Sequence, residues 1–289
     1  MSSTPANRRA ILMILGAALL FAVAAACVKA LGGAIPLAMV VLFRGAFALP
    51  VMLPLVARAG GWQVLRTRNP WGHVGRVFFG LVGMAGAFHG YATMPLATVT
   101  ALGFTMPLFL TLLSRPLLGE RITAPKLGAV LVGFVGVLVM LKPGLAAPGP
   151  AFDIAMVLLA ALGWALAMIS IRRMGEAGEP GIAIVAWFAI GASMVALVFA
   201  WPVWVWPSAT QWMLLLPIGL VSAVAQLLMT AAYRVGDTTL LAPFEYSGIL
   251  WTTALGLVVW AEAPDAWDAV GVAILVGCGL AIWKWGVTR

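Results

Sequence analysis

The chain contains 289 residues, of which 63% are hydrophobic and 9% are charged, and its mean hydropathy is +1.08. A soluble domain needs a far more charged surface, so this composition predicts a polytopic membrane protein. The formal net charge of +8 does not indicate a nucleic-acid partner, because the basic residues lie in short gaps between apolar runs and leave no polybasic tract.

A transmembrane helix needs about 20 mainly apolar residues. Breaking the chain at prolines, glycines and clusters of charge predicts ten such spans, and therefore an all-α fold. The first span lacks a clear cleavage site and is expected to be retained. In chain order the predicted spans are 10–31, 35–57, 71–93, 96–114, 122–141, 153–172, 180–201, 211–234, 238–260 and 265–285.

The distribution of Lys and Arg predicts how the spans are oriented. Fourteen of the seventeen basic residues lie on the side of the N-terminus, whereas Lys29 and Lys142 lie on the other side and Arg44 lies within the second span. Cytoplasmic loops retain positive charge during insertion, so both termini are predicted to be cytoplasmic. The fourteen are Arg8, Arg9, Arg58, Arg66, Arg68, Arg76, Arg115, Arg121, Lys126, Arg172, Arg173, Arg234, Lys284 and Arg289.

An internal repeat divides the chain into two halves, residues 10–141 and 153–285. Matched positions recur at an offset of 142 or 143 residues, and each half contains five predicted spans. Because five is odd, the second half enters the membrane from the opposite face, which predicts inverted repeats. Such repeats are typical of secondary transporters with a substrate site between the halves. The matched positions are 17–22 with 160–165, Lys29 with Arg172, Tyr91 with Tyr233, Glu120 with Glu262, Gly128 with Gly271 and Gly136 with Gly279.

Three motifs carry a family resemblance over nearly the whole chain. They are VVLFRGAFA around Arg44, the block YATMPLATVTALGFTMPLFLTLLSRPLLGE ending at Glu120, and LAALGWALAMISIRR around Trp164. With ten spans in two repeats, the chain resembles the drug/metabolite transporter (DMT) superfamily, specifically its EamA-type transporters. The resemblance implies a basket-like bundle with a central cavity that exports small metabolites, similar to bacterial exporters of aromatic and other amino acids. One departure is Ile249, which stands where the first half has Pro107.

Signatures of catalysis are absent from the sequence. It has no HExxH, GxSxG or phosphate-loop motif, and its two histidines, His73 and His89, are too few for an ordinary hydrolytic centre. The two cysteines, Cys27 and Cys278, fall in apolar runs and form neither a disulfide framework nor a metal-binding pattern. We therefore expect no enzyme activity, no direct use of ATP, no cofactor and no metal.

Two charged residues deep within predicted spans are the first candidates for a site. Glu245 is the only charge between Thr238 and Ala261, where a carboxylate costs roughly 2.5 to 3.5 kcal/mol on insertion scales. We favour a cavity carboxylate that binds a substrate ammonium or takes up a proton; the alternative is a static partner of Arg44 or of a backbone group. Arg44 either binds a substrate carboxylate or, as we favour, anchors carbonyl groups or Glu245. Tyr246 points about 100° away from Glu245 and can face a different helix.

Other polar and aromatic residues are candidates either for the cavity wall or for packing. His89, with Tyr91, lies toward the outer end of the third span and either lines an outward vestibule or is hydrogen-bonded in the core. Ser222 and Gln226 share one face of the eighth span, which fits a cavity wall and interhelical hydrogen bonds equally. Trp164 offers a stacking surface for an aromatic substrate or, as we favour, ordinary packing.

Together these features predict a secondary transporter that exports small amphipathic metabolites, chiefly aromatic or neutral amino acids, by alternating access through a central cavity. The alternatives are an exporter of other metabolites or drugs, such as nucleobases or sugars, and a lipid-handling or channel-like membrane protein. The expected partners are a small-molecule substrate and the lipid bilayer, without nucleic acid. Proton coupling and the choice between a monomer and a homodimer are left open.

Overall fold

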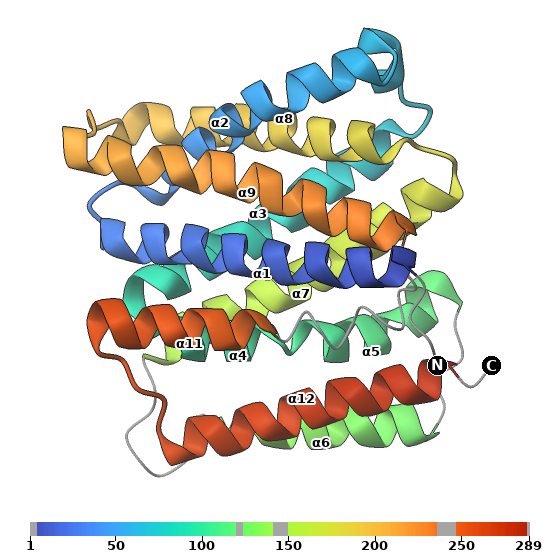
Figure 1. The fold of residues 1–289 in the computed structure, drawn as a ribbon, viewed down its shortest axis with the longest axis vertical. Coiled ribbons are helices and arrows are strands. Elements are labelled where there is room, and N and C mark those ends of the chain that lie inside the picture. The colour runs from blue at the N-terminus through green and yellow to red at the C-terminus, as the bar shows by residue number, and fades with distance from the viewer. Residues whose placement is uncertain (1–4, 120–123, 141–149, 236–246, 288–289) are drawn as a thin grey trace.

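The computed structural model describes residues 5–119, 124–140, 150–235 and 247–287, and every regular element within these ranges is helical (Figure 1). The predicted fold class, an all-helical polytopic membrane protein, is confirmed. Two 3₁₀ turns, Gly61–Leu65 and Trp201–Val203, follow α2 and α8. The helices are α1 (Pro5–Leu31), α2 (Leu37–Arg58), α3 (Pro70–Thr93), α4 (Leu96–Gly103), α5 (Met106–Leu118), α6 (Ala124–Met140), α7 (Ala151–Glu176), α8 (Gly181–Ala200), α9 (Ala209–Val235), α11 (Ser247–Trp260) and α12 (Ala266–Val287).

Six segments of the described chain are long and apolar enough to cross a membrane by length and composition, and three shorter apolar helices accompany them. Each of these segments overlaps a span predicted from the sequence. The six are Arg9–Leu31, Leu37–Arg58, Leu96–Leu113, Ala151–Glu176, Gly181–Val203 and Ala209–Met229. The three shorter helices are Val130–Val139, Ser247–Trp260 and Ala266–Cys278.

The fourth predicted span, residues 96–114, is not one helix but two, because the chain breaks at residues 104–105 between α4 and α5. Pro107 has no amide hydrogen and cannot donate the next helical hydrogen bond. At the break, the Thr105 amide and its fully buried hydroxyl both donate to the Leu102 carbonyl oxygen, at 3.0 and 2.8 Å. Irregular backbone at membrane depth needs such internal partners, so the break lies within packed protein.

The positions of the first and last helices define the two ends of the bundle. α1 begins and α12 ends at the same end, here named the terminal end, and the opposite end is named the far end (Figure 1). α1 runs from the terminal end to the far end, whereas α7, the first helix of the second half, runs from the far end to the terminal end (Figure 1). The first helices of the two halves therefore cross the bundle in opposite directions.

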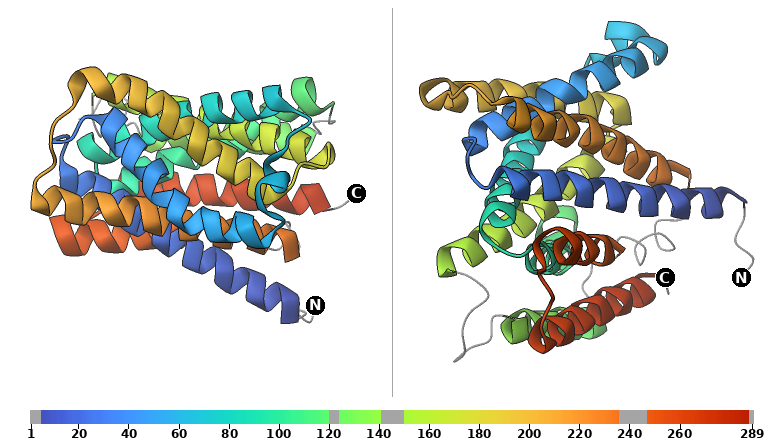
Figure 2. Two further views of the ribbon diagram at one scale, coloured as in Figure 1. Left: turned by 90° about the horizontal axis from the view of Figure 1, so that it is seen from above. Right: turned by 60° about the vertical axis from the view of Figure 1, so that its left-hand side comes forward.

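The most extensive helix contacts connect the two halves of the chain. α1 packs on α9, α3 on α7, and α2 on α8, while α6 and α12 pair side by side at one edge of the bundle (Figures 1 and 2). Replacing each helix by its counterpart in the other half turns the α1–α9 contact into the α7–α3 contact. The same exchange leaves the α2–α8 and α6–α12 contacts unchanged. The same set of helix pairs is therefore obtained when the two halves are exchanged.

Glycines allow α3 and α7 to approach each other closely. A Cβ on Gly163 of α7 would lie 2.8 Å from the backbone nitrogen of Gly83 of α3. A Cβ on Gly86 of α3 would overlap the Met156 carbonyl oxygen of α7. The two helices therefore touch backbone to backbone, as small residues permit between helices in a membrane.

Gly86→Ala is expected to lower the unfolding temperature in detergent, because the added methyl group meets a backbone oxygen that cannot rotate away. Overpacking of this kind typically costs about 1–3 kcal/mol. Gly75→Ala is the matched control on the same helix, since its Cβ would lie 3.8 Å from Ser170 Oγ, in ordinary contact. Thermal unfolding of both purified variants measures the difference, and equal unfolding temperatures would contradict a direct backbone contact.

An ion pair at the far end joins the two halves. Lys29 Nζ lies 2.8 Å from Glu262 Oε1 and also donates to the Met94 carbonyl oxygen at 2.8 Å. Glu262 Oε2 accepts a hydrogen bond from the Leu96 amide at 3.3 Å, at the start of α4. The two charged side chains are 11% and 25% exposed, so solvent weakens the pair only in part. These contacts tie α1 and the start of α4 to the end of α11.

A buried carboxylate at the terminal end joins the loop before α3 to the start of α8. Glu179 Oε1 accepts hydrogen bonds from the Thr67 hydroxyl at 2.7 Å and from the amides of Arg68 and Asn69 at 2.9 and 3.2 Å. Glu179 Oε2 lies 3.5 Å from His73 Nε2, and both side chains are almost fully buried. Burial raises the pKa of Glu179, but the donated hydrogen bonds outweigh it and leave this pKa below its ordinary value of 4.5.

Glu179→Ala is expected to destabilise the protein by about 1–3 kcal/mol at neutral pH, because buried donors lose their acceptor. The folded pKa is lowered, so the stabilising contribution of the carboxylate is present above 4.5 and is lost as the pH falls through the folded value. Thermal unfolding at neutral and acidic pH should show the gap to wild type narrowing on acidification. Glu176→Ala, which removes an exposed carboxylate, is the control and should keep wild-type stability. A gap that widens on acidification would contradict the assigned pKa direction.

Candidate functional site

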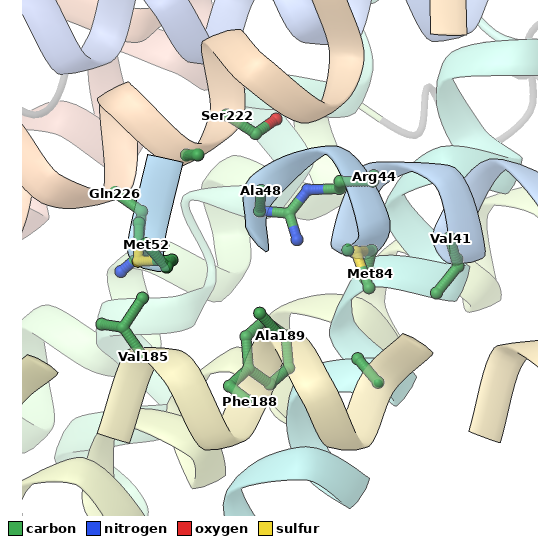
Figure 3. A pocket seen from close by; sticks show the side chains of 13 residues that line it. Val41, Arg44, Ala48, Met52, Met84, Val185, Phe188, Ala189, Ser222 and Gln226 are labelled. Carbon is green, nitrogen blue, oxygen red and sulfur yellow. The ribbon is translucent and has the colours of Figure 1, made fainter. Parts of the chain in front are cut away.

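A cavity lies between α2, α8 and α9, and Met84 of α3 closes part of its wall (Figure 3). Its volume, including its open mouth, is ≈ 430 Å³. The wall is apolar except for Arg44, Ser222 and Gln226. A mainly apolar cavity with a few convergent polar groups is typical of small-molecule sites. The other lining residues are Val41, Gly45, Ala48, Met52, Val185, Phe188, Ala189, Ala192 and Ala223.

Two glycines determine where Arg44 lies, because they let α8 and α9 close on α2. A Cβ on Gly45 of α2 would overlap the hydroxyl of Ser193 on α8. A Cβ on Gly219 of α9 would lie 3.1 and 3.2 Å from the carbonyl oxygens of Phe43 and Arg44. With α2 held between these two helices, the Arg44 guanidinium extends into the cavity (Figure 3).

The Arg44 side chain is half-buried, and no described carbonyl or carboxylate group holds its guanidinium. Glu245, one of the anchoring partners considered from the sequence, lies outside the described residues, so both roles of Arg44, anchoring and binding of a substrate carboxylate, stay predictions.

Helix α9 brings two further predicted residues to the same cavity. Ser222 is 3% exposed and Gln226, one turn later, is half-buried (Figure 3). Their spacing places both on the α9 face that packs toward α2. The structure therefore brings three of the eight predicted site residues, Arg44, Ser222 and Gln226, together on one cavity wall.

A second cavity adjoins the first and contains a basic side chain that is not among the predicted site residues. Its volume, including its mouth, is ≈ 360 Å³, and it shares Val185, Phe188 and Gln226 with the first. Arg76, which the count assigns to the side of the N-terminus, lies within α3 near its terminal end and is 9% exposed. The signal that identifies it is its position, since it is the only Lys, Arg, Asp or Glu in the predicted span 71–93.

Three other predicted site residues do not line these cavities. Trp164 packs over Gly83, where a Cβ would overlap the indole, and so fills the α3–α7 contact. Tyr91 is half-buried and packs against two hydrophobic clusters. His89 Nε2 lies 2.7 Å from Asp153 Oδ1, which joins α3 to the start of α7 at the far end. A role in contacting substrate stays a prediction for all three.

Glu245 and Tyr246 lie outside the described residues, so the roles predicted for them stay predictions. Among the residues that the structure does describe, no group of three or more His, Cys, Asp or Glu side chains is placed to hold a metal ion. The geometry of the candidate site therefore rests on the side chains of α2, α3, α8 and α9.

The protein is a helical membrane bundle in which the two halves make equivalent contacts with each other. Together with the mostly apolar cavity, this architecture is that of a solute transporter. The chain belongs to the EamA-like transporter family, whose model matches residues 8–142 and again residues 151–283. The resemblance read from the motifs is thereby confirmed. The family and the relatives described next are transporters and not enzymes.

Several proteins with named cargoes are similar along most of their length. The pseudopaline exporter CntI of Pseudomonas aeruginosa is 32% identical, with 93% of this chain and 94% of the relative aligned. The S-adenosylmethionine uptake transporter of Rickettsia prowazekii is 30% identical, with 84% and 81% aligned. The riboflavin transporter of Brucella anthropi is 28% identical, with 86% and 89% aligned. One solved crystal structure shares the fold with a TM-score of 0.67 at 22% identity, covering 95% of this chain and 96% of that chain.

Gly45→Ala is expected to push α2 away from α8, because the new Cβ overlaps Ser193 Oγ and lies 3.1 Å from the Ala189 carbonyl oxygen. We expect a loss of stability of about 1–3 kcal/mol. Adding Ser193→Gly removes the hydroxyl and should recover part of the loss, while the carbonyl contact remains. Thermal unfolding of both single variants and the double variant measures the coupling. Simple additivity of the two single effects would contradict the contact.

Proposed function

We propose that the protein is a secondary transporter that exports small amphipathic metabolites, in the first place amino acids, by alternating access through the cavity around Arg44. The observation that carries the proposal is the Arg44 guanidinium, which extends into this cavity without an acidic partner among the described residues (Figure 3). Ionisable side chains inside a membrane bundle are costly, and those that face a cavity commonly mark substrate or ion pathways.

The chemistry of the cavity fits a molecule with a carboxylate and an apolar part. A guanidinium group binds a carboxylate through two parallel hydrogen bonds. Ser222 and Gln226 on α9 add neutral hydrogen-bonding groups. Met52 and Met84 add flexible thioether chains, which adapt to apolar groups of different shape. For an amino acid, the ammonium group would be bound by the predicted partner Glu245.

The proposed cycle depends on the equivalence of the halves 10–141 and 153–285. Exchanging the two halves reproduces the same helix pairs. A state open to the terminal end and a state open to the far end can therefore be built from equivalent contacts. The excess of Lys and Arg on the terminal side supports a cytoplasmic terminal end in a bacterial inner membrane. Export then moves substrate from the terminal end toward the far end.

The relatives support transport but differ in cargo and in direction. The Pseudomonas aeruginosa relative is named as an exporter, which agrees with the proposed direction, whereas the Rickettsia prowazekii relative is named for uptake. Their cargoes, pseudopaline, S-adenosylmethionine and riboflavin, keep other metabolites as alternative substrates, including nucleobases, sugars and drugs.

Protein reconstituted in proteoliposomes is expected to catalyse saturable efflux of phenylalanine and leucine, and Arg44→Gln should reduce that efflux by about tenfold to a hundredfold. Hydrogen bonds to a charged group contribute about 1.5–3 kcal/mol, and their loss corresponds to this fold-change in efflux. Arg58→Gln is the matched control, since Arg58 is an exposed arginine at the other end of the same helix and should leave efflux unchanged.

Unchanged efflux in a folded Arg44→Gln protein removes this residue from substrate binding and contradicts the proposal. Flux that does not saturate with concentration indicates a channel-like protein, and lipid movement without solute flux indicates a lipid-handling one. An imposed pH gradient across the same vesicles tests for proton coupling.

A further inference from the structure

Arg76 is a second basic side chain inside the bundle, and the proposed function does not yet use it. It is 9% exposed, and its Nε has no hydrogen-bond partner in the described part of the chain. Its guanidinium carbon lies 3.9 Å from the ring centroid of Phe188, which is a close cation–π contact. Gly80 makes room for this pose, because a Cβ there would overlap both Arg76 Nη1 and the Phe188 ring.

The cavity beside Arg76 and the cavity around Arg44 are neighbours. They share Val185, Phe188 and Gln226, so a ligand that fills one reaches the edge of the other. Arg76 lies six residues from the start of α3 at the terminal end, whereas Arg44 lies seven residues from the start of α2 at the far end. The two charges are therefore spread along the transport direction.

Two like charges in a poorly solvated interior repel each other, and each also loses hydration. No described carboxylate pairs with either arginine. Glu179, the acid at the terminal end of α8, is occupied by Thr67 and by two backbone amides instead. A bound molecule with one anionic group would balance only one of the two charges, whereas a molecule with two anionic groups would balance both.

We propose that Arg44 and Arg76 form a two-point anion site that selects amino-acid-like substrates carrying two anionic groups, one for each guanidinium. This inference rests on the proposed function and narrows its substrate class. Phe188 lies between the two cavities, where it orients the Arg76 guanidinium and contacts the apolar linker of the substrate. Gln226, which lines both cavities, faces the polar part of that linker.

Matched substrate pairs test the proposal directly. Glutamate and glutamine, or aspartate and asparagine, have nearly the same shape but differ by one carboxylate. In proteoliposomes, the wild-type protein should prefer the dicarboxylate by about tenfold or more in its ratio of maximal rate to half-saturating concentration, because buried donors discriminate strongly against an analogue that leaves them unpaired. Arg76→Gln should reduce this preference to about twofold or less while retaining glutamine transport, whereas Arg44→Gln should impair both substrates.

Three further variants distinguish the charge of Arg76, the position of its guanidinium on Phe188, and the loss of an arginine from the protein surface. Arg76→Lys keeps the charge and should keep part of the preference. Gly80→Ala keeps the charge but displaces the guanidinium from Phe188, so it should weaken the preference without abolishing transport. Arg66→Gln removes an exposed loop arginine and should leave the preference unchanged. If Arg76→Gln does not fold in detergent, Gly80→Ala and Arg76→Lys still decide the question.

Equal transport of glutamate and glutamine by the wild-type protein overturns the two-point site. A preference for glutamate that persists in Arg76→Gln, or that disappears in Arg66→Gln, also overturns it. These failures leave the proposed function standing as long as phenylalanine efflux saturates and depends on Arg44. Loss of all saturable flux in the wild-type protein instead contradicts the proposed function itself.

Discussion

The high cost of a charge inside a membrane controls the structure around the cavity. A guanidinium at the depth of Arg44 needs water, an anion or a ring of acceptors. The described structure provides a hollow, since α8 and α9 close on α2 at Gly45 and Gly219 and still leave the arginine side chain an open space. Filling that hollow with apolar side chains would leave the charge uncompensated, at several kcal/mol. The cavity is therefore what makes an arginine tolerable in the middle of α2.

The fold class could be predicted because lipid leaves a chain few choices. Backbone groups must be paired within each apolar run, which means helices, and hydropathy finds these runs well. Hydropathy does not report whether every backbone hydrogen bond is made. Residues 96–114 are apolar almost throughout, yet the chain breaks at residues 104–105 just before Pro107, whereas α2 and α9 continue through Pro50, Pro54 and Pro217. A proline therefore interrupts a helix only in some surroundings, which an average of hydropathy over a long window cannot detect.

The candidate site could be predicted only in part, for a related reason. Arg44, Ser222 and Gln226 are each conspicuous as polar residues in apolar runs, but that signal concerns one helix at a time. Their meeting in one cavity depends on the distances between helices, which contacts such as that of Gly45 determine. Arg76 was missed as a site residue because it lies near a helix end and was used only as evidence of orientation, whereas its guanidinium packs inward on a phenylalanine.

The polar contacts between the halves differ in strength at the two ends of the bundle. At the far end the Lys29–Glu262 and His89–Asp153 pairs each keep one partner at least a quarter exposed, so solvent weakens both pairs in part. At the terminal end the Glu179 side chain is 5% exposed and accepts three hydrogen bonds, so breaking this contact leaves buried donors unpaired. Between the ends, the glycine contact of α3 with α7 involves backbone and depends on neither set. If the halves rock about that contact, separation at the far end breaks the two partly exposed pairs and the weak hydrogen bond from the Val205 amide to Met39 Sδ. It then leaves both the pivot and the Glu179 contact intact, which favours release of substrate at the far end.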